Sequence, residues 1–116
     1  MKMSYKKSEN PWHPFELAVS NFWKHSDDTP ILVHSDIADT EELLPSYFFR
    51  DITRWPHHEI DMLSRVRGTV LEIGAGVGSH VIELQKRGHQ VTANEASPVC
   101  CKIKQERGVQ TTLPGD

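Results

Sequence analysis

The sequence has few cysteines and no long apolar run. Its two cysteines, Cys100 and Cys101, are adjacent, and adjacent thiols rarely form a disulfide and do not have the spacing of a metal site. We therefore expect reduced, structural cysteines and no metal. No stretch is long and apolar enough to predict a membrane span, and the basic residues 1–7 lead into polar residues, not into the apolar segment of a secretion signal. These absences predict a cytoplasmic protein without a membrane partner.

Positive charge is also scarce, because 13 Lys and Arg face 16 Asp and Glu, a net charge of -3. A protein that binds a phosphate backbone needs an excess of basic residues, so we expect no nucleic-acid partner. The sequence has seven histidines, but their spacing is not that of zinc ligands. We expect them to face solvent or to cap helices: His13, His25, His34, His57, His58, His80 and His89.

The first part of the chain, residues 1–67, predicts a mostly helical extension. Apolar residues recur at helical spacing in residues 14–25, a pattern that favours core packing over cofactor contact: Phe15, Ala18, Val19, Phe22 and Trp23. Residues 31–33 are apolar and predict one short strand, and the acidic residues that follow predict a solvated loop: Asp36, Asp39, Glu41 and Glu42.

An aromatic segment, residues 47–55, then leads to Pro56, which is well placed to open a second helix. Ile60 and Leu63, with Met62 and Val66, are expected on the buried side of this helix. Gly68 is expected to end it, because helices commonly end in a left-handed residue.

From residue 69 the pattern changes to short strands that alternate with helices, which predicts a parallel sheet with crossover helices. The expected strands cover residues 69–73, 90–95 and 109–113, and the expected helices cover residues 79–87 and 98–107. Ser97 before Pro98 is a good helix start, and Gly88 and Gly108 fit helix ends. We predict an α/β fold of Rossmann-like type, a fragment of a three-layer sandwich with the strands in the order 3-2-1, over residues 68–116.

The most informative segment is a glycine-rich loop between the first strand of this sheet and the helix after it, Gly74-Ala75-Gly76-Val77-Gly78. Such a loop lets a ligand lie against bare backbone. Glu72 lies within the apolar strand, where an unpartnered carboxylate is costly, so it favours a cationic or hydrogen-bonding ligand. Glu95 follows at the end of the next strand, where an acid can accept both hydroxyls of an adenosine ribose.

These residues resemble the first motif and the ribose-binding acid of class I S-adenosylmethionine-dependent methyltransferases. The resemblance implies S-adenosylmethionine as cofactor, a small-molecule methyl acceptor, and the glycines of the loop together with Ala75 against the methionine portion. Glu72 would organise the ammonium, Glu95 would bind the ribose, and Ala96 and Asp116 would lie near the adenine.

Upstream, the segment from Tyr47 to Arg50 resembles the leader of a group of bacterial small-molecule methyltransferases, in which it folds over the cofactor. The resemblance also implies further strands and an acceptor-facing loop that are not in this sequence. We therefore expect the chain to be inactive alone, and no residue is assigned as a catalytic base.

Two other functions remain open from the residues themselves. One is a non-catalytic nucleoside-binding or interaction module, and the other is part of an NAD(P)-dependent oxidoreductase, although the glycine order here differs from Gly-x-Gly-x-x-Gly.

Whichever function applies, the outer edge of the first strand of the sheet is expected to be open. An open edge predicts self-association into a homo-oligomer, or a cover formed by residues 31–33.

Overall fold

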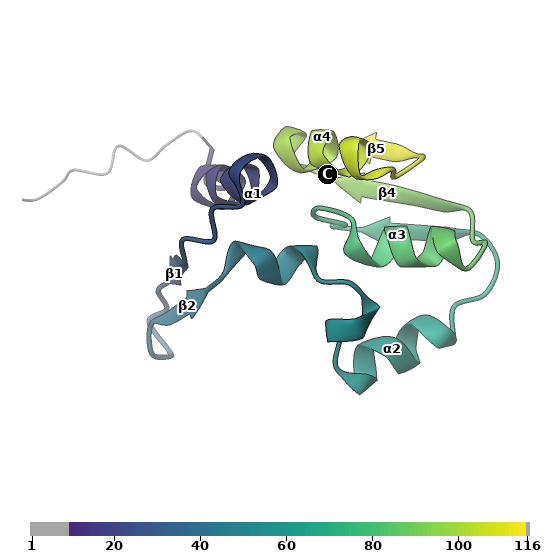
Figure 1. Cartoon of the computed structure of the whole chain (residues 1–116), viewed down its shortest axis with the longest axis horizontal. Coiled ribbons are helices and arrows are strands. Elements are labelled where there is room, and N and C mark those ends of the chain that lie inside the picture. The colour runs from purple at the N-terminus through teal and green to yellow at the C-terminus, as the bar shows by residue number, and fades with distance from the viewer. Residues whose placement is uncertain (1–9, 116) are drawn as a thin grey trace, which may run out of the picture.

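The computed structural model describes residues 10–115, which form an α/β structure (Figure 1). The elements in chain order are α1 (His13–His25), β1 (Ile31–Val33), β2 (Glu41–Leu43), the 3₁₀ helices η1 (Pro45–Phe49) and η2 (Ile52–Arg54), α2 (His57–Ser64), β3 (Val70–Ile73), α3 (Ser79–Lys86), β4 (Val91–Glu95), α4 (Pro98–Arg107) and β5 (Thr112–Pro114). Among these residues no helix has the length and apolar character needed to cross a membrane.

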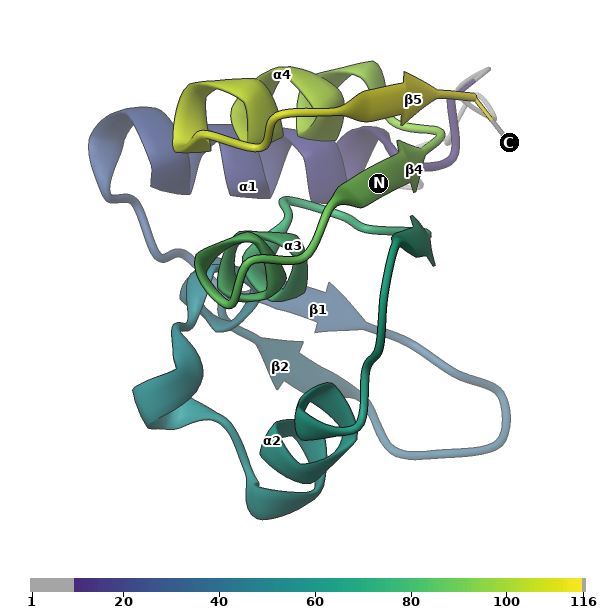
Figure 2. The same ribbon diagram turned by 90° about the vertical axis from the view of Figure 1, so that its right-hand side faces the viewer.

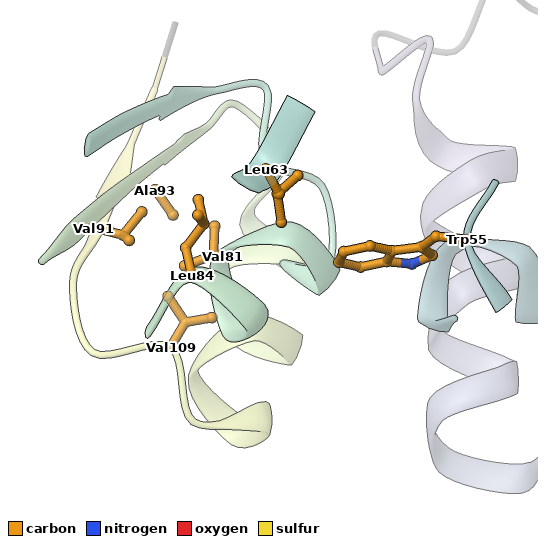
Figure 3. Packing of buried hydrophobic residues seen from close by; sticks show 7 residues of the cluster. All are labelled: Trp55, Leu63, Val81, Leu84, Val91, Ala93 and Val109. Carbon is orange, nitrogen blue, oxygen red and sulfur yellow. The ribbon is translucent and has the colours of Figure 1, made fainter. Parts of the chain in front are cut away.

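The centre of the fold is a three-stranded parallel sheet in the order β3-β4-β5. Its main core lies between the sheet and α3, where Val81 and Leu84 of the helix pack with Val91 and Ala93 of β4 (Figure 3). Val109, which precedes β5, belongs to the same cluster, as do Leu63 and Trp55. The prediction of a parallel sheet with crossover helices is confirmed, except that the third strand begins at Thr112 and not at residue 109.

Alternation along the strands decides which way the acidic residues point. Glu72 pairs with Ala93, so both lie on the face of the sheet that the helices cover. Glu95 is two residues further along β4 and therefore lies on that same face. The other face carries Leu71 and Ile73, which are 59% and 77% exposed.

The helix α1 lies beside α4, as both views show (Figures 1 and 2). Val19 of α1 packs with Cys100 and Ile103 of α4. A polar contact supports the same interface, because the hydroxyl of Ser97 donates to the buried carboxylate of Glu16 at 3.0 Å. The N-terminal extension is thus attached directly to the helix that follows β4.

Both cysteines are free and buried, as their sequence context predicts. Burial raises the pKa of the Cys100 thiol and of the Cys101 thiol, which disfavours the reactive thiolate. Their role in the described structure is packing within α4.

The expected loop, and one of the two alternatives for the open edge of the sheet, are wrong. Glu41 and Glu42, expected in a loop, form β2 together with Leu43, and β1 pairs with β2 in an antiparallel hairpin. Residues 31–33 therefore do not cover β3, whose outer edge has no partner strand within residues 10–115. The reason is that two short segments close in sequence pair at lower entropic cost than a distant pairing with β3 would require.

The second predicted helix is present but shorter than expected. It ends at Ser64 with Arg65 as its cap, so Gly68 lies in the following turn. Leu63 is buried as predicted, whereas Met62 is 68% exposed. Trp55, before this helix, reaches the main core from the other side of α3 (Figure 3).

Candidate functional site

A cavity of about 700 Å³ lies where the N-terminal extension meets the carboxyl ends of β3 and β4. This is the position at which parallel α/β sheets bind ligands, and the volume is in the range of small-molecule sites. The cavity brings together the predicted site residues that lie in the described range: Tyr47, Arg50, Glu72, Gly74, Ala75, Gly76, Gly78, Glu95 and Ala96. Asp116, also predicted, lies outside the described residues.

The glycine loop presents bare backbone to this cavity. Gly76 has a positive φ of 57°, a conformation that glycine adopts without strain. A Cβ atom added at Gly74 or at Gly76 would meet nothing within 4 Å. The loop is thus open on its cavity side, and a ligand can approach its peptide groups closely.

Glu95 is held at the end of β4 by two backbone amides. The amide of Gly76 donates to Oε2 at 2.6 Å, and the amide of Ser97 donates to Oε1 at 3.1 Å. Each carboxylate oxygen has a second lone pair. The carboxylate is therefore fixed in position and can still accept hydrogen bonds from hydroxyl groups of a ligand.

The loop is also attached to the elements behind and beside it. Arg107 of α4 donates to the carbonyl oxygen of Val77 at 2.7 Å. The hydroxyl of Ser79 donates to the carbonyl oxygen of Phe48 in η1 at 2.6 Å. These bonds fix the loop relative to both α4 and the extension, which favours a preformed site.

Glu72 has one carboxylate oxygen in contact with a neighbour and one without. Its Oε1 lies 3.5 Å from Nδ1 of His80. Its Oε2 is buried and has no hydrogen-bond partner among the described residues. A buried carboxylate oxygen without a donor is costly, so this atom is a point at which a ligand donor would be favourable.

His80 keeps 41% of its side chain exposed, but it also contacts two acidic residues of the cavity, which the sequence does not predict. Its Nε2 lies 3.2 Å from Oε2 of Glu59, so the ring is bracketed by two carboxylates, and its edge-to-face contact with Trp55 has a centroid distance of 4.9 Å. The interaction with Glu72, followed by that with Glu59, raises the pKa of His80 above its usual value, although burial opposes this shift. The imidazolium therefore persists to higher pH than in an exposed histidine.

Arg50 extends this set of charges into the extension. Its guanidinium lies 3.6 Å from Glu59 and 3.8 Å above the ring centre of Tyr47. It also donates to the carbonyl oxygens of Tyr47 and Arg54. Arg50 thus holds the aromatic segment over the cavity, and the nitrogen atoms of its guanidinium already have partners within the protein.

The aromatic stripe of α1 is divided between core and cavity. Phe22 and Trp23 pack against Phe49, and Trp23 remains 37% exposed. Phe15 packs edge-to-face on Phe48 and also lines the cavity. Phe15 thus packs against the core cluster around Val19, as expected, and in addition lines the cavity.

Sequence reasoning missed Trp12, Trp55, Glu59 and His80 as cavity residues. Glu59 and His80 are far from each other in sequence and match no motif. The available signal was weak: His80 comes two residues after the last glycine of the loop, in the first turn of the helix that follows it.

No protein-family model and no curated protein matches the sequence. Among solved structures, the chain is similar to a SAM-dependent methyltransferase from Bacteroides fragilis in complex with S-adenosyl-L-homocysteine, with a TM-score of 0.78 and 30% identity over 85% of this chain. A second structure, which concerns the conversion of a disulfide bond into a thioacetal group during echinomycin biosynthesis, matches 51% of the chain with a TM-score of 0.44 and 23% identity. This second likeness is too low to support an argument.

The chain spans 41% of the Bacteroides fragilis protein and 28% of the second one. The match to the Bacteroides fragilis protein covers 85% of this chain. The resemblance to S-adenosylmethionine-dependent methyltransferases, first indicated by the glycine loop and its two acidic neighbours, is thus confirmed over the part of such a protein that this chain spans.

Proposed function

We propose that the cavity binds S-adenosylmethionine and that the chain is the cofactor-binding part of a methyltransferase that acts on a small-molecule acceptor. The observation that carries this proposal is that Glu72 and Glu95 line one cavity, on either side of a glycine loop with bare backbone. The likeness to a methyltransferase that was crystallised with S-adenosyl-L-homocysteine supports it.

The residues present fit the chemistry of this cofactor. The unpartnered Oε2 of Glu72 suits the ammonium of the methionine portion, because it is an acceptor without a donor. Glu95, held in place by two amides, suits the ribose hydroxyls. A pyrophosphate would fit poorly, because both carboxylates would repel it.

The remaining assignments follow from the positions around the cavity. Gly74, Gly76 and Gly78, with Ala75, would let the methionine portion lie against the loop, and Ala96 would border the adenine. Tyr47 and Arg50 would cover the cofactor from the side of the extension. Asp116, at the end of the chain, is proposed near the adenine amino group.

The bound cofactor would supply an electrophilic methyl group on its sulfonium. The residues of this chain would contribute by fixing the cofactor and by excluding water from the methyl group with the aromatic side chains of η1 and α1. Positioning of the acceptor would fall to parts of a longer protein, which is why we propose that the chain alone is inactive.

We propose the same division for the fold. Residues 1–67 would form an extension that closes over the cofactor, and residues 68–116 would be the first part of a Rossmann-like three-layer sandwich with strands in the order 3-2-1. The exposed Leu71 and Ile73 support this proposal, since a third layer would cover that face of the sheet.

Isothermal titration calorimetry of the chain with S-adenosyl-L-homocysteine tests the proposed function. We expect saturable binding by the chain, and at least about tenfold weaker binding by Glu95→Ala, because the loss of hydrogen bonds to a charged acceptor costs about 1.5–3 kcal/mol. Glu42→Ala, at an exposed position of β2 and outside the cavity, is the matched control. Equal affinity of the chain and Glu95→Ala, or tighter binding of NADH, would refute the proposal.

A further inference from the structure

His80 connects three elements of the cavity wall through charge. It belongs to α3, and it contacts Glu72 of β3 at 3.5 Å and Glu59 of α2 at 3.2 Å. Trp55 packs against its ring, and Arg50 lies 3.6 Å from the far oxygen of Glu59. With a protonated imidazole, Arg50 and His80 carry two positive charges and Glu59 and Glu72 carry two negative charges. The Glu72 oxygen that has no hydrogen-bond partner therefore belongs to a cluster with no net charge.

A second cation brought to Glu72 changes this balance. The ammonium of an adenosyl amino acid would meet Oε2 of a carboxylate whose Oε1 already faces the imidazolium. Two cations on opposite oxygens of one carboxylate repel each other, and the repulsion is stronger in a partly desolvated cavity than in water. A guanidinium cannot be deprotonated in proteins, so the imidazolium is the cation that can be neutralised.

We propose that binding of the cofactor ammonium at Glu72 releases the proton of His80, so that the affinity of the site for its cofactor rises with pH. This inference rests on the proposed function. The N–H bond of the imidazolium is the one bond that breaks; the proton passes to the buffer, and the neutral imidazole remains between the two glutamates. His80 acts as a positioning residue that holds Glu72 in place before the ammonium takes over as its counter-ion.

This role differs from that of a purely structural contact between α2 and α3. A purely structural contact would stabilise the free and the ligand-bound state equally, and the protonation of His80 would then not depend on the ligand. The carboxylate that would receive the ammonium, Glu72, is also the main cause of the raised pKa of His80, so the ammonium and the imidazolium would compete for it. By linkage, a ligand that lowers this pKa binds more tightly as the pH rises.

The test is calorimetry of the 116-residue chain with S-adenosyl-L-homocysteine at about pH 6.5, near the usual pKa of imidazole, in phosphate and in Tris. The two buffers differ in ionisation enthalpy, so the difference in the observed enthalpy gives the number of protons released. We expect release of a fraction of a proton, and an affinity that rises by up to about tenfold per pH unit before it levels off. 5′-Methylthioadenosine, which lacks the ammonium and the carboxylate, should bind without proton release.

Variants assign the proton to its source. His80→Gln should abolish the release, and Glu59→Gln should move it to lower pH, because removal of one carboxylate lowers the pKa of the imidazole. His58→Gln, at an exposed position of α2 outside the cavity, should release as many protons as the unchanged chain. Circular dichroism confirms that each variant is folded.

The outcomes separate this inference from the proposed function. Binding of S-adenosyl-L-homocysteine without proton release, or with undiminished release in His80→Gln, overturns the inference and leaves the proposed function intact. Release that is equal for 5′-methylthioadenosine also overturns it, because the ammonium would then not be the cause. Absence of binding by either ligand refutes the proposed function, and the inference with it.

Discussion

Replacement of Gly78 by alanine tests how tightly the glycine loop is packed. Gly78 has a φ of 87°, and a Cβ atom at this position would lie 2.9 Å from Cγ of Lys104 and 3.0 Å from Cγ2 of Val109. Lys104 is fully buried, so its Cγ cannot move aside easily. The left-handed backbone costs a non-glycine residue about 1–2 kcal/mol, and overpacking costs about 1–3 kcal/mol.

Gly78→Ala should therefore reduce the free energy of unfolding by about 2–5 kcal/mol, the sum of the backbone and packing costs. Gly88→Ala is the matched control, because Gly88 has a similar φ of 90° and nothing within 4 Å of an added Cβ. This control should lose only the backbone part, about 1–2 kcal/mol. The assay is urea unfolding at equilibrium, followed by the fluorescence of the tryptophans.

The reasoning is refuted if Gly78→Ala is no less stable than Gly88→Ala. A double variant provides a second check, since Lys104→Ala removes the Cγ atom that the new methyl group would meet. The combined loss for Gly78→Ala and Lys104→Ala should then be smaller than the sum of the two single losses, and an additive result would show that the contact is not the cause.

Three further predictions concern groups at or near the site. Lys104→Met should raise the free energy of unfolding by about 1–2 kcal/mol, because the buried Nζ has no hydrogen-bond partner among the described residues. Urea unfolding measures this gain, and Lys102→Met, at an exposed position, should show little change. The open edge of β3 and the exposed Ile73 predict that the chain self-associates as its concentration rises. Light scattering should show this association and should show less of it for Ile73→Lys, and a monomer at every concentration would contradict the prediction. Because the pKa of His80 is raised on folding, its contribution to stability should be complete at low pH and should be lost as the pH rises through its folded-state pKa; unfolding midpoints that depend on pH equally in His80→Gln would exclude this.

The sequence predicts the elements around the glycine loop well because their determinants are local. The apolar run before Gly74, the glycines themselves, and the Ser97-Pro98 helix start each specify the backbone within a few residues. The hydroxyl of Ser97 does accept from the amide of Cys100, as a helix cap should. The same local rules brought both acidic residues to one cavity.

The errors lie where distant residues decide the outcome. The β1–β2 hairpin depends on pairing between two short segments, and the start of β5 depends on its register with β4. The environment of His80 depends on three elements that meet only in the folded chain. No spacing in the sequence connects Glu59, Glu72 and His80, and so the sequence predicts only a solvent-facing or capping histidine and not its two carboxylate contacts.

A crystal structure of the chain with S-adenosyl-L-homocysteine tests the central claim most directly. The claim predicts that the ribose hydroxyls lie within hydrogen-bond distance of the Glu95 carboxylate and that the ammonium reaches Oε2 of Glu72, with the methionine portion along the glycine loop. A ligand bound elsewhere, or bound in the cavity with neither carboxylate in contact, would contradict the claim.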